Sequence, residues 1–183
     1  MFTKSNNLWL RARRVGLLAV LLGSLAPAAA VSAFGDALGD CNDAENPASR
    51  IAGCTAIIEA GPSSDVRAVA LMNRGIGYAA EGALSDALAD FDAALEASPG
   101  MIEGFYNRGN VNLDLGRSED AIRDFGRVIE AEPRFALAWL NRGLAREQAG
   151  DFAGARSDVG RALALNASLD AARRALGRLN RKR

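Results

Sequence analysis

Apolar and charged residues alternate with a helical period in the second half of the chain. Ile122, Phe125 and Ile129 recur at spacings of three and four residues, which places them on one face of a helix. The other face carries only charge: Arg123, Asp124, Arg127 and Glu130. The pattern predicts an amphipathic helix over about 119–131, which ends at Glu132 because the residue before a proline avoids helical angles.

A first helix is predicted just before this one, from about residue 103 to 115. Gly116 follows it and is suited to the left-handed backbone that ends many helices. Ser118 then fits as the N-cap of the second helix or as a residue of its first turn. Gly109 and Ala121 are small, so the two antiparallel helices are expected to approach closely.

This helix pair is repeated along the chain with a period of 34 residues. The triplet Asn-Arg-Gly begins at residues 73, 107 and 141, and alanine recurs at Ala87, Ala121 and Ala155. A further glycine follows each triplet seven residues after its own glycine: Gly82, Gly116 and Gly150. Three units, 68–101, 102–135 and 136–169, are therefore predicted. No single pair can bury its apolar face alone, so stacked units are expected to share one continuous core.

The pattern resembles the tetratricopeptide repeat (TPR), whose signature has aromatic, glycine, alanine and proline positions. The second unit carries Phe105, Gly109, Ala121, Phe125 and Pro133, the first Gly75, Tyr78, Ala87, Phe91, Ala94 and Pro99, and the third Trp139, Gly143, Ala155 and Ala162. Arg74, Arg108 and Arg142 replace the usual leucine, and Asn112 and Arg146 replace the usual tyrosine. The resemblance implies an all-α solenoid of helix-turn-helix repeats that forms a right-handed superhelix.

The resemblance also implies a function, because in this family the first helices line a concave groove that holds a peptide. The groove residues would be Met72, Ile76, Tyr106, Asn110, Leu113, Leu140 and Leu144. We therefore expect a non-catalytic scaffold that binds peptide segments of partner proteins. The other interpretation of the apolar members of this set is that they pack between neighbouring units.

The recurring arginines Arg74, Arg108 and Arg142 have two interpretations. They could form a ladder that binds phosphates, or they could pair with the carboxylates that recur at the same interval: Asp90, Asp124 and Asp158. We expect ion pairs, since structural pairs of this kind are common.

The first 33 residues have the pattern of a secretory signal peptide. Four basic residues precede an apolar run from Val15 to Ala26, and small residues follow, with cleavage predicted after Ala30 or Ala33. The alternative is an uncleaved membrane anchor, but the apolar run is short of the roughly 20 residues that span a bilayer. We therefore expect an exported protein, periplasmic or secreted.

Residues 34–67 are expected to form an N-terminal cap. A helix over 50–60 resembles the second helix of a degenerate preceding unit, and Gly61-Pro62 breaks the chain after it. Cys41 and Cys54 are the only cysteines. We expect a structural disulfide, since such bonds persist in exported proteins. The alternative is two buried free thiols.

Residues 170–183 predict a basic capping helix. Leu169, Ala172, Leu176 and Leu179 form its apolar stripe. Its cations are Arg173, Arg174, Arg178, Arg181, Lys182 and Arg183. Such a helix could bind an anionic membrane surface or an acidic partner, which would suit an accessory factor of envelope assembly or export. The alternative is a solvated cap, since the helix dipole favours cations at a C-terminus.

Composition narrows the function classes further. The chain has no histidine and only two cysteines, which excludes histidine-based triads and four-thiolate metal sites. We therefore expect no enzyme, no cofactor and no metal, and no nucleic-acid partner. The net charge of zero combines +4 over residues 1–33, −10 over 34–170 and +6 over 171–183. The repeat region is thus acidic and its C-terminal cap is basic.

Overall fold

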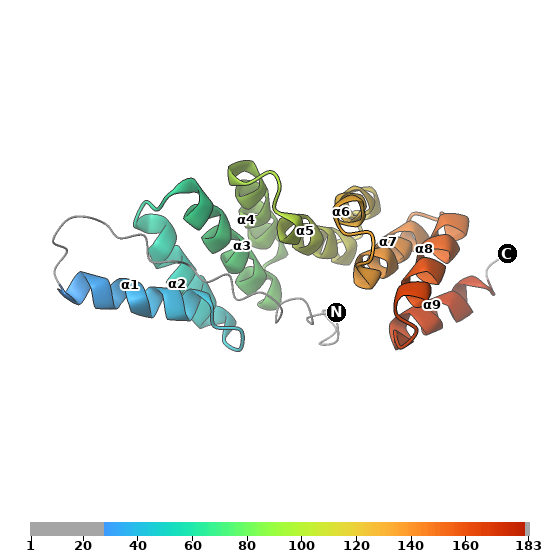
Figure 1. Ribbon diagram of the computed structural model, residues 1–183, viewed down its shortest axis with the longest axis horizontal. Helices are drawn as coiled ribbons and strands as arrows, with labels where there is room; N and C mark the ends of the chain where they lie inside the picture. The colour runs from blue at the N-terminus through green and yellow to red at the C-terminus, as the bar shows by residue number, and fades with distance from the viewer. Residues whose placement is uncertain (1–27, 182–183) are drawn as a thin grey trace. The chain divides into compact units, whose positions relative to one another are not determined.

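The computed structural model describes residues 28–181, and this part of the chain is built from helices (Figure 1). Their bounds are α1 (Ala28–Cys41), α2 (Pro47–Glu59), α3 (Ser64–Ala80), α4 (Leu84–Ala97), α5 (Ile102–Asp114), α6 (Ser118–Ala131), α7 (Ala136–Gln148), α8 (Phe152–Leu165) and α9 (Asp170–Leu179). No strand occurs among these described residues. The predicted all-α repeat fold is confirmed.

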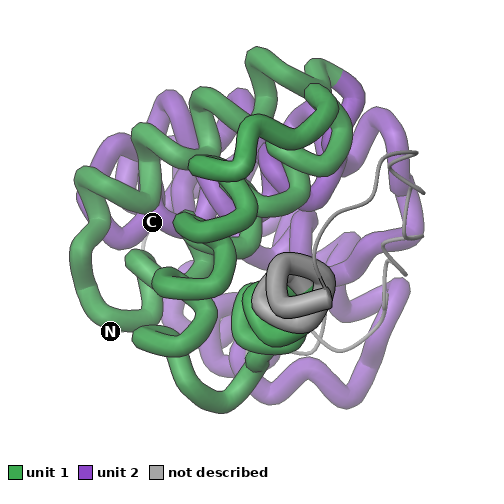
Figure 2. Tube along the Cα trace, turned by 90° about the vertical axis from the view of Figure 1, so that its left-hand side faces the viewer, with its two compact units in different colours: residues 1–99 green, residues 100–183 purple. Residues whose placement is uncertain are grey.

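The chain divides into two compact units, residues 1–99 and residues 100–183 (Figure 2). In the first unit, α2 packs against α1 and α3, and α3 packs against α4. In the second, α5 and α6 form one antiparallel pair, α7 and α8 form the next, and α9 packs on α8 and α7. Helices α4, α6 and α8 begin 34 residues apart, as the sequence period predicts.

The turns within the helix pairs follow the glycine positions. Gly82, Gly116 and Gly150 have φ angles of 79°, 72° and 85°, which is the left-handed region that glycine adopts without steric cost. Ser118 is the first residue of α6 rather than its N-cap, and its hydroxyl donates to the Gln148 side chain instead. Of the two roles expected for Ser118, the structure shows the first-turn role.

A second set of glycines brings the paired helices together. A Cβ atom at Gly109 would lie 3.0 Å from Cε1 of Phe125, and one at Gly143 would lie 2.8 Å from Cγ2 of Val159. Phe125 and Val159 are fully buried, as is Ala121. The small residues are therefore where the core side chain of each second helix meets the backbone of the first.

The N-terminal cap contains a helix, α1, that the sequence analysis did not predict. It is joined to α2 by the Cys41–Cys54 disulfide, which confirms the predicted bond. Asn46 caps α2 by accepting from the Ser49 amide at 3.1 Å, and Pro47 opens the helix. The predicted cleavage points after Ala30 and Ala33 lie within α1, and the remainder of the predicted signal peptide lies outside the described residues.

The crossing of α1 and α2 depends on Gly53. A Cβ atom there would lie 2.5 Å from the Cys41 nitrogen and 2.6 Å from the Ala37 oxygen, and both are backbone atoms that cannot move aside without shifting α1. Gly53→Ala is therefore expected to lower the free energy of unfolding by about 1–3 kcal/mol.

Gly126 supplies a matched control, because it lies within α6 and a Cβ atom there meets nothing within 4 Å. Gly126→Ala is expected to raise the free energy of unfolding by about 0.5–1 kcal/mol through helix propensity alone. Urea denaturation followed by circular dichroism measures both variants. Equal changes in the two would contradict the close α1–α2 contact.

Candidate functional site

The recurring arginines are bound within the fold, as the ion-pair interpretation predicts. Each first helix presents one arginine to the aspartate of the following helix through two hydrogen bonds. The nitrogen–oxygen distances are 2.8 and 2.8 Å for Arg74–Asp90, 3.0 and 2.6 Å for Arg108–Asp124, and 2.8 and 2.9 Å for Arg142–Asp158. The three carboxylates are buried, so these arginines hold the helix pairs together and the pairing with Asp90, Asp124 and Asp158 is confirmed.

The departures from the usual tyrosine belong to the same polar layer. Asn112 donates to Asp124 at 3.2 Å, and Arg146 reaches Asp158 at 3.0 Å. In the first unit the position keeps Tyr78, whose ring lies 5.8 Å from the Arg74 guanidinium. The carboxylate of Asp90 raises the pKa of Arg74 above its ordinary value. Each substitution thus adds a polar or aromatic contact to the ion pair beside it.

Asparagine pairs join the first helices within each unit. In the first unit, Asn73 Nδ2 of α3 donates to Asn42 Oδ1 beside α1, at 3.4 Å. In the second, Asn141 Nδ2 of α7 donates to Asn110 Oδ1 of α5, at 2.8 Å. Both pairs are separated by 31 residues, so Asn42 and Asn110 occupy equivalent places two periods apart. The face formed by α1 and α3 therefore corresponds to the face formed by α5 and α7.

Two residues predicted to line the groove lie in the core instead. Tyr106 is 3% exposed and packs against Phe125 and Phe135, with ring centroids 6.0 and 5.0 Å away. Its hydroxyl accepts from Asn141 Nδ2 at 3.3 Å, and burial raises its pKa to about 12. Leu140 is 1% exposed and packs with α8 and α9. For these two positions the packing interpretation holds, because neither side chain is accessible to a ligand.

The other predicted groove residues are half-buried on the first helices. Met72 and Ile76 lie on α3, Asn110 and Leu113 on α5, and Leu144 on α7. Leu144 also packs partly against the core shared by α7, α8 and α9. Each of these side chains retains accessible surface, unlike Tyr106 and Leu140.

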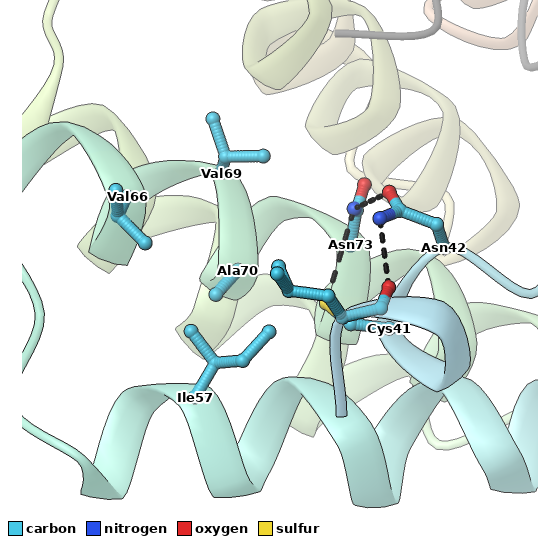
Figure 3. Close-up of a pocket in the computed structure, with 8 residues that line it drawn as sticks. Cys41, Asn42, Ile57, Val66, Val69, Ala70 and Asn73 are labelled. Carbon is cyan, nitrogen blue, oxygen red and sulfur yellow. Dashed lines mark hydrogen bonds between the residues drawn. The ribbon is translucent and has the colours of Figure 1, made fainter. Parts of the chain in front are cut away.

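A small pocket lies in the first unit, between α1 and α3 and above α2 (Figure 3). It has about 200 Å³ of empty space that opens to solvent. Apolar side chains form most of its wall, and the Asn42–Asn73 pair stands at one side (Figure 3). The lining residues are Leu38, Cys41, Asn42, Ile57, Val66, Val69, Ala70 and Asn73.

The pocket follows from side-chain size. Two periods further along the chain, Leu38 corresponds to Tyr106 and Ile57 corresponds to Phe125. In the second unit those two aromatic rings are packed together in the core. The aliphatic residues of the first unit are smaller, so the corresponding space is left open.

Sequence analysis missed the α1 side of this pocket. Val69, on α3, is predicted for the inner face by the TPR resemblance, but Leu38 and Asn42 were assigned only to a cap. The equivalence of Asn42 with Asn110, at twice the repeat period, is the signal that would have found them.

The basic C-terminal residues have mixed surroundings. Arg178 donates two hydrogen bonds to Glu147, at 2.8 and 2.6 Å, and Arg173 pairs with Asp170. Arg174 and Arg181 are exposed, and Lys182 and Arg183 lie outside the described residues. Ala172, Ala175 and Leu179 are buried against α7 and α8, so α9 closes the core at this end. The predicted capping helix is present, and two of its arginines hold it to the body or to its own first turn.

Two further searches of residues 28–181 gave no site. No group of three or more cysteine, aspartate or glutamate side chains in this part is placed to hold a metal ion. Within the same range, no helix has the length and apolar character needed to cross a bilayer.

Residues 106–179 match the family described as tetratricopeptide repeat. No curated protein matches the chain in sequence. Among solved structures, MamA (41-end) from Desulfovibrio magneticus RS-1 is 22% identical with a TM-score of 0.74, covering 85% of this chain and 86% of that one.

Two peptide complexes are also similar. The first TPR of Spaghetti (RPAP3), bound to the HSP90 peptide SRMEEVD, is 22% identical with a TM-score of 0.61, covering 66% of this chain and 94% of that one. The second TPR domain of human RPAP3, in complex with the HSP70 peptide SGPTIEEVD, is 24% identical with a TM-score of 0.62, covering 65% and 99%. These likenesses establish an all-α fold of the TPR type.

Proposed function

We propose that this chain is a non-catalytic interaction scaffold of the cell envelope, which binds peptide segments of partner proteins on the faces of its first helices. The TPR-type fold supports the proposal, as do the two similar structures that hold peptides. The observation that carries it is the α1–α3 face, where an open apolar pocket stands beside an asparagine pair. Apolar pockets that alternate with backbone-binding amides are suited to an extended peptide.

The envelope location is part of the proposal and depends on the sequence pattern of residues 1–33. Export would place Cys41 and Cys54 in a compartment where a disulfide persists, in agreement with the bond between them. The scaffold would then act outside the cytoplasm, as a periplasmic or secreted protein.

Site-specific photocrosslinking in cells tests the proposed binding face. A benzophenone-bearing amino acid replaces Val69 or Asn110 on the first helices, and replaces Glu130 on the outer side of α6 as the matched control. We expect protein adducts from positions 69 and 110 and few from position 130. Val69 and Asn110 are half-buried and Glu130 is exposed, so simple accessibility would give the opposite order.

The same experiment tests the membrane or acidic-partner role of the C-terminal helix. A truncation after residue 170 would remove the buried residues of α9, so exposed Arg174 and Arg181 are replaced by serine instead. Adducts at positions 69 and 110 should survive this change. If the double serine variant lost every adduct, the accessory role through the basic helix would replace the peptide-binding role.

A further inference from the structure

The pocket of the first unit has the size of a site for one side chain. Its empty space of about 200 Å³ is below the range of about 300–1,000 Å³ that holds drug-sized ligands. Leu38, Ile57, Val66 and Val69 supply an aliphatic wall. A linear aliphatic or branched side chain fits such a wall, since it offers no buried polar group to bind a charged one.

The rim can bind a peptide backbone beside that side chain. Asn42 Nδ2 donates to the Leu38 carbonyl at 2.8 Å, and its Oδ1 accepts from Asn73 Nδ2 (Figure 3). The Asn73 amide is thereby oriented by Asn42, and its own Oδ1 is an acceptor suited to a peptide N–H. In the second unit the same position, Asn141, donates to the Tyr106 hydroxyl that fills the corresponding space.

Charge identifies what should flank the anchor side chain. Residues 28–99 contain 11 carboxylates and three arginines, a net charge of −8. Nine of the carboxylates are exposed, whereas Arg67 is the one exposed arginine of this described stretch. Arg50 is buried and Arg74 is bound to Asp90. Such a surface attracts cationic segments and repels acidic peptides and anionic lipid.

We propose that the α1–α3 pocket binds one aliphatic side chain of an extended peptide whose neighbouring residues are lysine or arginine. The inference rests on the proposed function, and it adds the site and the chemistry of the ligand. It confines the anchor to the first unit, because in the second unit Tyr106 and Phe125 occupy the equivalent places.

The chain supplies its own variants for the test. Tyrosine stands at the equivalent of Leu38 two periods along, and methionine stands there one period along, as Met72. Leu38→Tyr should therefore fill the pocket within a fold that already accepts this residue. Leu38→Met is the matched control and keeps a flexible aliphatic side chain of similar volume.

Selection from a phage-displayed library of random dodecapeptides, on the full purified chain, reads out the preference. We expect enrichment of an aliphatic residue beside lysine or arginine, with affinity that weakens as ionic strength rises. Affinity for a selected peptide should fall at least about tenfold in Leu38→Tyr, as expected when the burial of one aliphatic side chain is lost. Leu38→Met should bind nearly as wild type. Methyl signals of Leu38, Ile57 and Val69 in the unaltered chain should shift when the peptide is added.

Two outcomes would overturn the inference, and they are distinguishable. Enrichment of acidic peptides, or binding by Leu38→Tyr with no shift of those methyl signals, would leave peptide binding intact and refute this site and ligand class. Enrichment of no peptide by any form of the protein would refute the proposed function and the inference with it.

Discussion

An Asp158→Ala variant is expected to lose about 3–5 kcal/mol of its free energy of unfolding. Asp158 is 1% exposed and binds two cations at once, Arg142 by two hydrogen bonds and Arg146 at 3.0 Å. Removing the carboxylate leaves two partly buried guanidinium groups without their counter-charge. The cost should lie near the lower bound, because both arginines keep some contact with water.

The control for this prediction is the exposed pair on α6. Arg123 and Asp120 lie three residues apart, and their side chains are 70% and 47% exposed. Asp120→Ala should therefore change the free energy of unfolding by less than about 1 kcal/mol. Urea denaturation compares the two variants directly. If Asp158→Ala cost no more than Asp120→Ala, the ion-pair layer would not be the structural element described above.

Reduction of the Cys41–Cys54 disulfide is expected to lower the stability of the N-terminal cap by about 3 kcal/mol, from the loss of a closed loop of about 14 residues. Because each repeat contacts only its neighbours, the effect should be local. Amide hydrogen exchange should become faster in α1 and α2 when a dithiol is added, and should stay unchanged in α9.

A double Cys41→Ser/Cys54→Ser variant separates the bond from other effects of the reductant. It should show the fast exchange in α1 without any dithiol and should not respond to one. Unchanged exchange in reduced wild-type protein would contradict a stabilising role for the disulfide. The result also bears on the pocket, because α1 carries Leu38 and the disulfide holds this helix to α2.

The regular part of the fold could be predicted from the sequence because several local signals agree there. For α6 the apolar face, the preceding Gly116 and the following Glu132-Pro133 step each indicate the same helix, and its observed bounds differ by one residue at the start. The arginine–aspartate pairs were equally predictable. Both partners recur with one period, so any geometry that joins one pair joins all three.

Helix α1 could not be found in this way. It follows directly on residues with the pattern of a signal peptide, it contains Gly35 and Gly39, and its partner α2 belongs to a degenerate unit. Its position is fixed by tertiary contacts, namely the disulfide and the close approach at Gly53. The pocket depends on α1 and was therefore missed with it.

Tyr106 and Leu140 show the limit of carrying a groove over from a family pattern. Helix register places both on the inner side of a first helix, but register does not determine how deep a side chain lies. Tyr106 is drawn into the core by Phe125, Phe135 and the Asn141 amide. Leu38, at the equivalent place in the first unit, has no aromatic partner among the residues that line the pocket and leaves an opening instead.

The photocrosslinking map tests most directly the central claim, that partner proteins bind on the first-helix faces. The account predicts that positions 69 and 110 form adducts with other proteins, that the adducts at position 69 weaken in Leu38→Tyr but persist in Leu38→Met, and that exposed position 130 forms few. Adducts at position 130 equal to or stronger than those at 69 and 110 would contradict the claim, since they would place the partners on the outer side of the helices.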